Sequence, residues 1–169
     1  ACDFIDRHKG PGKKPFFLYY PMMLPHWPFE PTPDSDDWDP TFRRNDKSEK
    51  GYGLRGKKHF IDMVHYTDKM VGKIVAKLEE AGLRENTLVI FTCDNGTFGG
   101  ITSRFKGRDW QGGKGHMMDN GTHVPLIVSW PGVAPAGRVN GDLIDFSDVL
   151  PTLAEAAGAK VPDSLNIDG

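Results

Sequence analysis

Residues 87–96 read Thr-Leu-Val-Ile-Phe-Thr-Cys-Asp-Asn-Gly, and this stretch decides the fold class. A near-continuous apolar and β-branched run of this length is typical of a strand buried on both faces, as in the parallel sheet of an α/β protein. Ligands of open α/β sheets bind at the carboxyl ends of the strands. Asp94 and Asn95 stand at such an end and offer the hard oxygen ligands that suit Ca²⁺ or Mg²⁺. These ten residues also leave open a strand followed by an ordinary Asn-Gly turn.

A second motif, Gln-Gly-Gly-Lys-Gly at residues 111–115, precedes another apolar run at residues 124–130. The glycines leave the ammonium of Lys114 without bulky neighbours, so that it can approach a phosphate- or sulfate-like oxyanion closely. The Gly-x₄-Gly-Lys-[Ser/Thr] pattern of a nucleotide-binding P-loop is not met. The alternative is a glycine-rich surface loop with a solvated lysine.

A third motif follows the short aromatic run at residues 16–20, which we expect to be a further strand. His26 lies between Pro25 and Pro28, and two prolines this close restrict the backbone φ angles on both sides of the imidazole. A histidine held in this way suits a general acid or a contact to an anion. The alternative is a polar surface histidine.

The three motifs, in this order and at these separations, resemble the sulfatases of the alkaline-phosphatase superfamily. The resemblance runs from about Phe4 to the end of the chain and includes residues 66–72, 83–87 and 145–153. It implies an α/β fold, with a mixed, largely parallel sheet and flanking helices. It also implies an arylsulfatase-like enzyme that uses Ca²⁺, or else Mg²⁺, to hydrolyse a small-molecule or carbohydrate sulfate ester.

The resemblance implies a role for each motif residue. Asp94 and Asn95 would bind the metal ion, Lys114 would bind and neutralise the sulfate group, and His26 would bind the substrate and protonate the leaving alcohol. The same geometry would also serve a phosphonate or phosphate ester hydrolase of this superfamily. A third alternative is a degenerate, non-catalytic module.

Other aromatic and histidine residues are weaker candidates. Trp27, Trp110 and His116 are candidate substrate contacts. Aromatic side chains in such loops can stack on sugars or aryl groups, but they fill loop cores equally well. We expect the histidines at positions 59, 65 and 123 to be structural or exposed. After the lysine, the family's usual Glu-Gly and Arg are replaced by Asp119-Asn120 and His123.

The resemblance also shows what these 169 residues do not contain. The Cys-x-Pro-x-Arg motif, whose cysteine becomes the formylglycine nucleophile of sulfatases, is absent, and so is the early Asp-Asp pair that supplies further metal ligands. We therefore expect residues 1–169 to be part of one catalytic domain, lacking its N-terminal nucleophile and metal segment and its C-terminal subdomain. We expect the chain alone to be inactive. A periplasmic, extracellular or lysosomal parent protein is implied by the resemblance only.

Composition limits the class of protein without identifying a substrate. The chain is 38% hydrophobic with a formal net charge of −2, so it has no basic surplus for nucleic acid and no apolar run that could span a membrane. Its two cysteines have no metal or redox spacing. Nothing in the sequence indicates the oligomeric state.

Periodicity predicts the helices. Apolar residues at spacings of three and four predict a helix over residues 58–81, ended by Gly82 in a left-handed conformation with Leu83 returning to Leu78. A final helix is predicted over 147–157, with Ser147 as its N-cap. Residues 21–55 and 97–123 are predicted to be loops.

Overall fold

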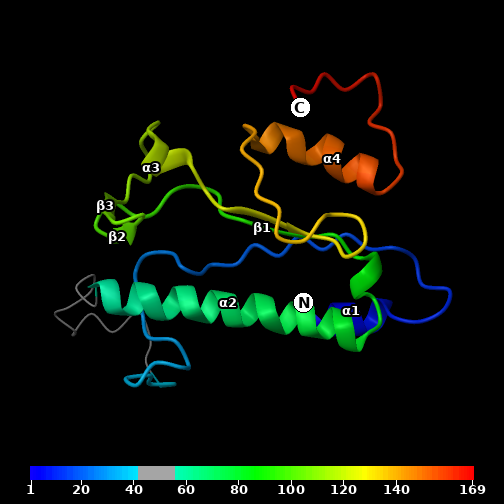
Figure 1. The fold of residues 1–169 in the computed structure, drawn as a ribbon. Helices are drawn as coiled ribbons and strands as arrows, with labels where there is room; N and C mark the ends of the chain where they lie inside the picture. The colour runs from blue at the N-terminus through cyan, green and yellow to red at the C-terminus, as the bar shows by residue number, and fades with distance from the viewer. Residues whose placement is uncertain (42–55) are drawn as a thin grey trace. The chain divides into compact units, whose positions relative to one another are not determined.

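The computed structural model describes residues 1–41 and 56–169, which divide into two compact units (Figure 1). The first unit, Ala1–Pro135, contains α1 (Cys2–His8), α2 (Gly56–Glu80), the 3₁₀ turn η1 (Arg84–Asn86), β1 (Val89–Thr92), β2 (Thr102–Phe105), β3 (Arg108–Gln111), α3 (Asp119–Thr122) and β4 (Leu126–Ser129). The second, Ala136–Gly169, contains the 3₁₀ turn η2 (Phe146–Asp148) and α4 (Val149–Ala156). None of the helices in the described residues combines the length and apolarity needed to cross a bilayer.

α2 is the long helix that the sequence predicts. Its buried face carries His59, Met63 and Thr67, which follow one another at four-residue spacing and so lie one above the other on the helix. Val64, which belongs to the predicted apolar stripe, is instead 42% exposed. The buried face of α2 therefore includes Thr67 and Leu78 of the predicted stripe and adds the row with His59 and Met63, which meets the preceding loop.

The end of α2 confirms the prediction for Gly82, whose φ is +69°. The Leu83 N–H donates to the Leu78 carbonyl and the Gly82 N–H donates to the Glu79 carbonyl, both at 2.9 Å. These are the two hydrogen bonds of a Schellman motif. A residue without Cβ adopts this conformation at little steric cost, and the chain turns here from α2 toward β1.

β1 and β4 are neighbouring strands, as predicted, but they pair antiparallel, with Val89 opposite Ser129 and Thr92 opposite Leu126. The sequence predicts a mixed, largely parallel sheet that contains these two strands, and this pair of it is antiparallel. An apolar run indicates a strand with two apolar faces, yet it carries no information about the direction of its neighbour. Residues 16–20 are also not a strand, because no ladder joins them to another strand in the described part of the chain.

The predicted loop 97–123 contains a hairpin and a short helix. β2 and β3 pair antiparallel, with Thr102 opposite Gln111. Lys106 and Gly107 form the tip, and both have positive φ angles, +48° and +77°. This combination is that of a type I′ turn, whose twist matches a hairpin. The hairpin is mostly exposed, so no apolar alternation marks it in the sequence.

The core of the first unit brings three distant segments together. Phe29, Met63 and Ile101 are buried and form one cluster, with Leu24 and Phe60 packed against it. Phe29 follows the histidine motif, Met63 lies on α2, and Ile101 directly precedes β2. Apolar contacts, rather than strand pairing, therefore anchor the segment that carries the proline-flanked histidine.

α1 packs on α2 at the other end of the long helix (Figure 1). Ile5 is 1% exposed, and Asp6 Oδ2 lies 3.2 Å from the ammonium of Lys77. Phe16 contacts the ring of Phe4 edge-on, with centroids 5.5 Å apart. The beginning of the predicted strand 16–20 is thus attached to α1 through a side chain.

The second unit contains the predicted helix, although its start differs from the prediction. The 3₁₀ turn η2 leads into α4, and its N-cap is Asp145, whose carboxylate accepts a 2.7 Å hydrogen bond from the Ser147 N–H. The Asp145 N–H in turn donates to the Asp148 carboxylate, which completes a capping box. Hydrogen bonds from the Ser147 hydroxyl and backbone hold the pKa of Asp145 below its usual range.

Candidate active site

Asp94 and Asn95 follow β1 after one residue, Cys93, at the strand end where the sequence predicts a metal site. Asp94 is exposed and Asn95 is half-buried. Burial raises the pKa of the adjacent Cys93 thiol, and the negative charge of Asp94 adds to the rise. A carboxylate and a carboxamide therefore stand together at this position, with oxygens of the type that Ca²⁺ and Mg²⁺ prefer.

Backbone hydrogen bonds join the Asp-Asn-Gly loop to the lysine loop. The Gly96 N–H donates to the Gly121 carbonyl at 2.8 Å, and the Lys114 N–H donates to the Thr97 carbonyl at 3.0 Å. Thr97 lies only three residues beyond Asp94, which spans at most about 11 Å of chain. The structure thus places the backbone of Lys114 next to the predicted metal loop.

Glycines make this close approach possible. A Cβ on Gly112 would lie 2.1 Å from the backbone oxygen of Phe98, and a Cβ on Gly113 would lie 2.3 Å from Oδ1 of Asn120. On the other side of the junction, a Cβ on Gly96 would lie 2.2 Å from the backbone oxygen of Asn120. Real Cβ atoms do not approach other atoms so closely, so any side chain here would force the two loops apart.

This finding changes the interpretation of the motif. The sequence suggests that the glycines give Lys114 a flexible, unobstructed backbone. Gly115 fits that view, because its φ is +90° and a Cβ there would meet no atom within 4 Å. Gly112 and Gly113 do the opposite, since they fix the loop by contact. Lys114 is consequently an exposed side chain on a tightly held backbone.

His26 is exposed, and its ring is held by its own chain. Nδ1 lies 2.5 Å from the carbonyl oxygen of Trp27, and the His26 N–H donates to the Met23 carbonyl at 2.9 Å. Because a carbonyl can only accept, Nδ1 carries the hydrogen and Nε2 is the nitrogen left to exchange a proton. This arrangement suits a proton donor to a leaving group.

Aromatic contacts connect the histidine motif to the other two. The rings of Trp27 and Phe98 are stacked with centroids 6.2 Å apart, and Phe29 meets Phe98 edge-on at 6.0 Å. Phe98 follows the residue that accepts the hydrogen bond from Lys114. The three motifs therefore share one region of the first unit. Within the described residues, no hydrogen bond or ion pair links the four predicted side chains directly to one another.

A small cavity of about 130 Å³ adjoins Asn95. Its lining includes Ser103 and Trp110 from the hairpin, with Asn120 and His123 from the segment after the lysine. Trp110 was among the weaker sequence candidates, and its place here is compatible with a substrate contact. Ser103 and Asn120 carried no signal in the sequence, because the hairpin and α3 that position them were not predicted.

Three further histidines differ in their exposure and in their contacts. His123 is exposed, as expected, and pairs with Asp119 at 2.9 Å. His116 is exposed and does not line the cavity beside Asn95. His59, expected to be structural or exposed, is 3% exposed and lies between two carboxylates.

Comparison with known proteins identifies the family. A sequence model of the Sulfatase family matches residues 1–159. This chain belongs to the sulfatase family. The whole sulfatase chain aligns with mouse steryl-sulfatase at 40% identity and with human arylsulfatase D at 32% identity, covering 25% and 26% of these relatives. It spans about a quarter of the length of the curated relatives it matches.

A solved structure supports the same assignment. The crystal structure of Ps i-CgsB in complex with k-i-k-neocarrahexaose is similar to 99% of this sulfatase chain, with a TM-score of 0.71 and 28% identity, and the match covers 34% of that chain. The predicted α/β, alkaline-phosphatase-like fold class is therefore confirmed at the level of the family. Membership of the family also implies a metal-binding site.

Proposed function

We propose that this sulfatase chain supplies two metal ligands, an anion-binding lysine and a proton donor for the hydrolysis of a sulfate ester. The observation that carries the proposal is the backbone junction between the Asp-Asn-Gly loop and the lysine loop. It brings a strand-end carboxylate and an exposed ammonium into one region, while the ring contacts of Phe98 bring the histidine motif to the same place.

Asp94 and Asn95 fit a divalent cation by the chemistry of their donor atoms. Both lie just beyond the end of β1, and their oxygens are of the hard type that Ca²⁺ binds. A cation here would polarise a sulfate oxygen. Ca²⁺ takes six to eight oxygen ligands, so two from this chain bind it weakly, at millimolar concentration or above. The other protein ligands, and the formylglycine nucleophile that the family uses, would come from outside these 169 residues.

Lys114 and His26 would act on the two ends of the scissile bond. The ammonium of Lys114 neutralises charge on the sulfate oxygens as a point charge. The Nδ1–H of His26 donates a hydrogen bond to the Trp27 carbonyl. A proton delivered to the leaving alcohol would therefore come from Nε2 of the doubly protonated ring. The rigid backbone beneath Lys114 holds the charge in place without reorganisation during the reaction.

The names of the relatives point to different substrates. The alcohol part of the sulfate ester, which leaves on hydrolysis, is therefore less well defined than the sulfate part. The neighbouring structure is a complex with k-i-k-neocarrahexaose, whereas a curated relative is a steryl-sulfatase. The cavity beside Asn95, with Trp110 on its wall, offers space for a ring of either kind. We propose an aryl or carbohydrate sulfate ester as the substrate class.

Anion titration tests the proposal on the chain itself. We expect inorganic sulfate to shift the amide NMR signals of residues 113–115, and Lys114→Ala to abolish these shifts. Lys106→Ala is the matched control, because Lys106 is also an exposed lysine beside a glycine in the first unit, at the hairpin tip. Equal loss of binding in both variants would contradict the proposal. Much stronger binding of phosphate than of sulfate would favour the phosphate-ester alternative.

A further inference from the structure

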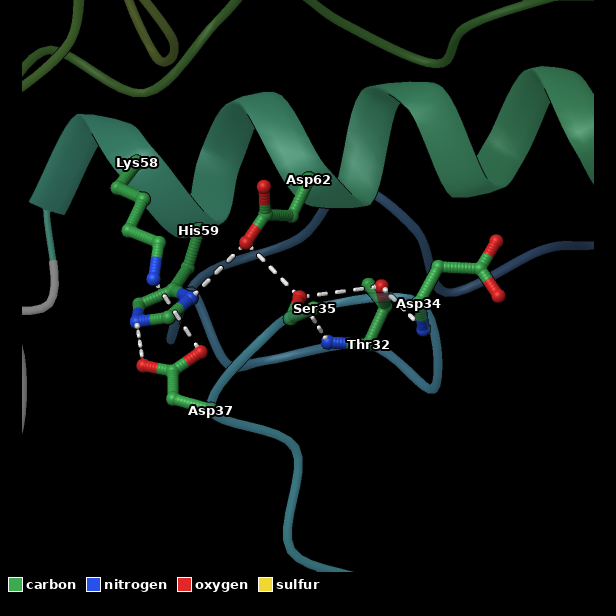
Figure 2. Close-up of polar contacts among 7 residues, drawn as sticks. All are labelled: Thr32, Asp34, Ser35, Asp37, Lys58, His59 and Asp62. Atoms are coloured by element: carbon green, nitrogen blue, oxygen red, sulfur yellow. Dashed lines mark hydrogen bonds and ion pairs between the residues drawn. The ribbon is translucent and has the colours of Figure 1, made fainter.

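We propose that Asp37 and His59 form a second divalent-cation site, suited to Zn²⁺ or a similar first-row ion and oriented by Asp62. The site is separate from the Asp94 loop and uses none of the residues assigned above to sulfate ester hydrolysis. Figure 2 shows the residues involved, which come from the loop before α2 and from the first turns of α2.

The imidazole of His59 lies between two carboxylates. Nδ1 is 3.3 Å from Oδ2 of Asp62, one turn along the same helix, and Nε2 is 3.4 Å from Oδ2 of Asp37 in the preceding loop (Figure 2). One potential ligand atom from each of the three residues lies within 4.8 Å of the others. His59 itself is 3% exposed, so its ring cannot turn freely into solvent.

Asp62 fixes which nitrogen of His59 is free. Its Oδ2 accepts a hydrogen bond from the hydroxyl of Ser35 at 2.8 Å, which holds the carboxylate in place. Both ring nitrogens face a carboxylate, but only Nδ1 and Asp62 have the geometry of a hydrogen bond, so in the neutral ring we place the hydrogen on Nδ1, and the lone pair of Nε2 then points toward Asp37. A carboxylate behind a histidine is the usual means by which proteins orient a metal-binding imidazole.

The separation of His59 from Asp37 is the one expected of two ligands that share an ion. Nε2 lies 3.4 Å from Oδ2 of Asp37 as an ion-pair contact, whereas only the 3.3 Å contact of Nδ1 with Asp62 has the geometry of a hydrogen bond. Two ligands that are each about 2.1 Å from a tetrahedral ion are about 3.4 Å apart. An imidazole and a carboxylate form a donor set for Zn²⁺ or a similar ion, whereas Ca²⁺ prefers oxygen ligands alone.

The surroundings leave room for the remaining ligands and include one competitor. The side chain of Asp37 is 46% exposed, so water can complete the coordination from the solvent side. The ammonium of Lys58 lies 3.4 Å from Oδ1, the other oxygen of Asp37, and its side chain is 57% exposed. Lys58 can move away, but its positive charge opposes a bound cation. Removing that charge is expected to tighten binding.

Zn²⁺ titration of the 169-residue chain tests the site, with both cysteines alkylated so that thiolates do not compete. We expect Zn²⁺ to shift the ring NMR signals of His59 and Asp37→Asn to weaken binding at least about tenfold. Asp34→Asn is the matched control, because Asp34 belongs to the same loop but pairs with Lys69. It should bind Zn²⁺ as the unchanged chain does, whereas Lys58→Met should bind it more tightly.

Two results would overturn the proposal. One is Zn²⁺ binding that is equal in the Asp37→Asn and Asp34→Asn variants, which would place the ion elsewhere. The other is the absence of any response from the His59 ring, which would show that the imidazole is not a ligand and that its contacts with the two carboxylates are only structural. Neither result bears on sulfate binding at Lys114, which is measured separately.

Discussion

Two loops of the first unit are held by opposite means. Residues 112–115 are held by backbone hydrogen bonds and by Gly112 and Gly113, which leave no space for a Cβ. Residues 32–37 are held on α2 by side chains: Ser35 with Asp62, Asp34 with Lys69, and Asp37 with Lys58 and His59. Backbone amides and carbonyls do not titrate near neutral pH and carry no net charge, whereas contacts through charged side chains depend on pH, salt and ions. The proposed catalytic lysine sits on the first kind of loop, and the proposed Zn²⁺ site on the second.

The largest expected effect is that of a side chain at the glycine junction. In Gly112→Ala, the new Cβ would lie 2.1 Å from a backbone oxygen, so the loops must separate or the backbone must strain. We expect a loss of about 3 kcal/mol in the free energy of unfolding, measured by urea denaturation. Gly72→Ala in α2 is the control, because no atom lies within 4 Å of its Cβ and alanine should stabilise the helix by about 0.5–1 kcal/mol. Similar effects of the two changes would mean that the junction is not tightly packed.

An intermediate effect is expected where a side chain holds the second loop. Ser35 accepts a hydrogen bond from the Thr32 N–H at 2.9 Å and donates one to Asp62 at 2.8 Å. Ser35→Ala removes both, which should cost about 1–2 kcal/mol and speed amide exchange over residues 32–37. Ser164→Ala, at an exposed position of the second unit, should change neither quantity. Unchanged exchange in Ser35→Ala would show that the loop does not depend on this side chain.

The smallest expected effect is that of acid on a charged contact. Hydrogen bonds from Lys9 and Lys77 hold the pKa of Asp6 below its usual range. The contact of α1 with α2 therefore gains from Asp6 at neutral pH, and the gain is lost as the pH falls below about 4 and through the lowered value. Amide exchange of α1 should rise in that range, while the Lys114 amide should keep its protection. Asp6→Asn should remove the pH dependence of α1 exchange; if it does not, another group is responsible.

The sequence predicts features that depend on residues close together in the chain. The helix α2 and its Schellman end follow from a repeated apolar spacing and one glycine, both of which are local. The strands β1 and β4 follow from their apolar runs. The four predicted site residues come from motifs of a few residues each, and the structure brings their segments to one region.

Features that depend on distant partners could not be predicted in the same way. The direction of β4 against β1 depends on the path of the intervening chain, and the burial of His59 depends on a loop more than twenty residues earlier. The glycines of the lysine loop suggest flexibility in sequence, and only the opposing backbone shows that they are needed for contact. Asp145 and Ser147 are both acceptable N-caps by residue type, so the choice between them is made by the packing of the turn.

The two ends of the β2–β3 hairpin lie next to each other at its base, beside the site. The Gly112 N–H donates to the Ile101 carbonyl at 2.8 Å, which closes the base of the hairpin immediately before the lysine loop. Residues inserted at the exposed tip, beside Gly107, would lengthen the excursion without moving either end. The number of residues between Asn95 and Lys114 can therefore change at the tip without a change in the backbone hydrogen bonds that hold the two ends. The tip is for the same reason the place at which a tag or a foreign peptide could be carried by this chain without disturbing the site.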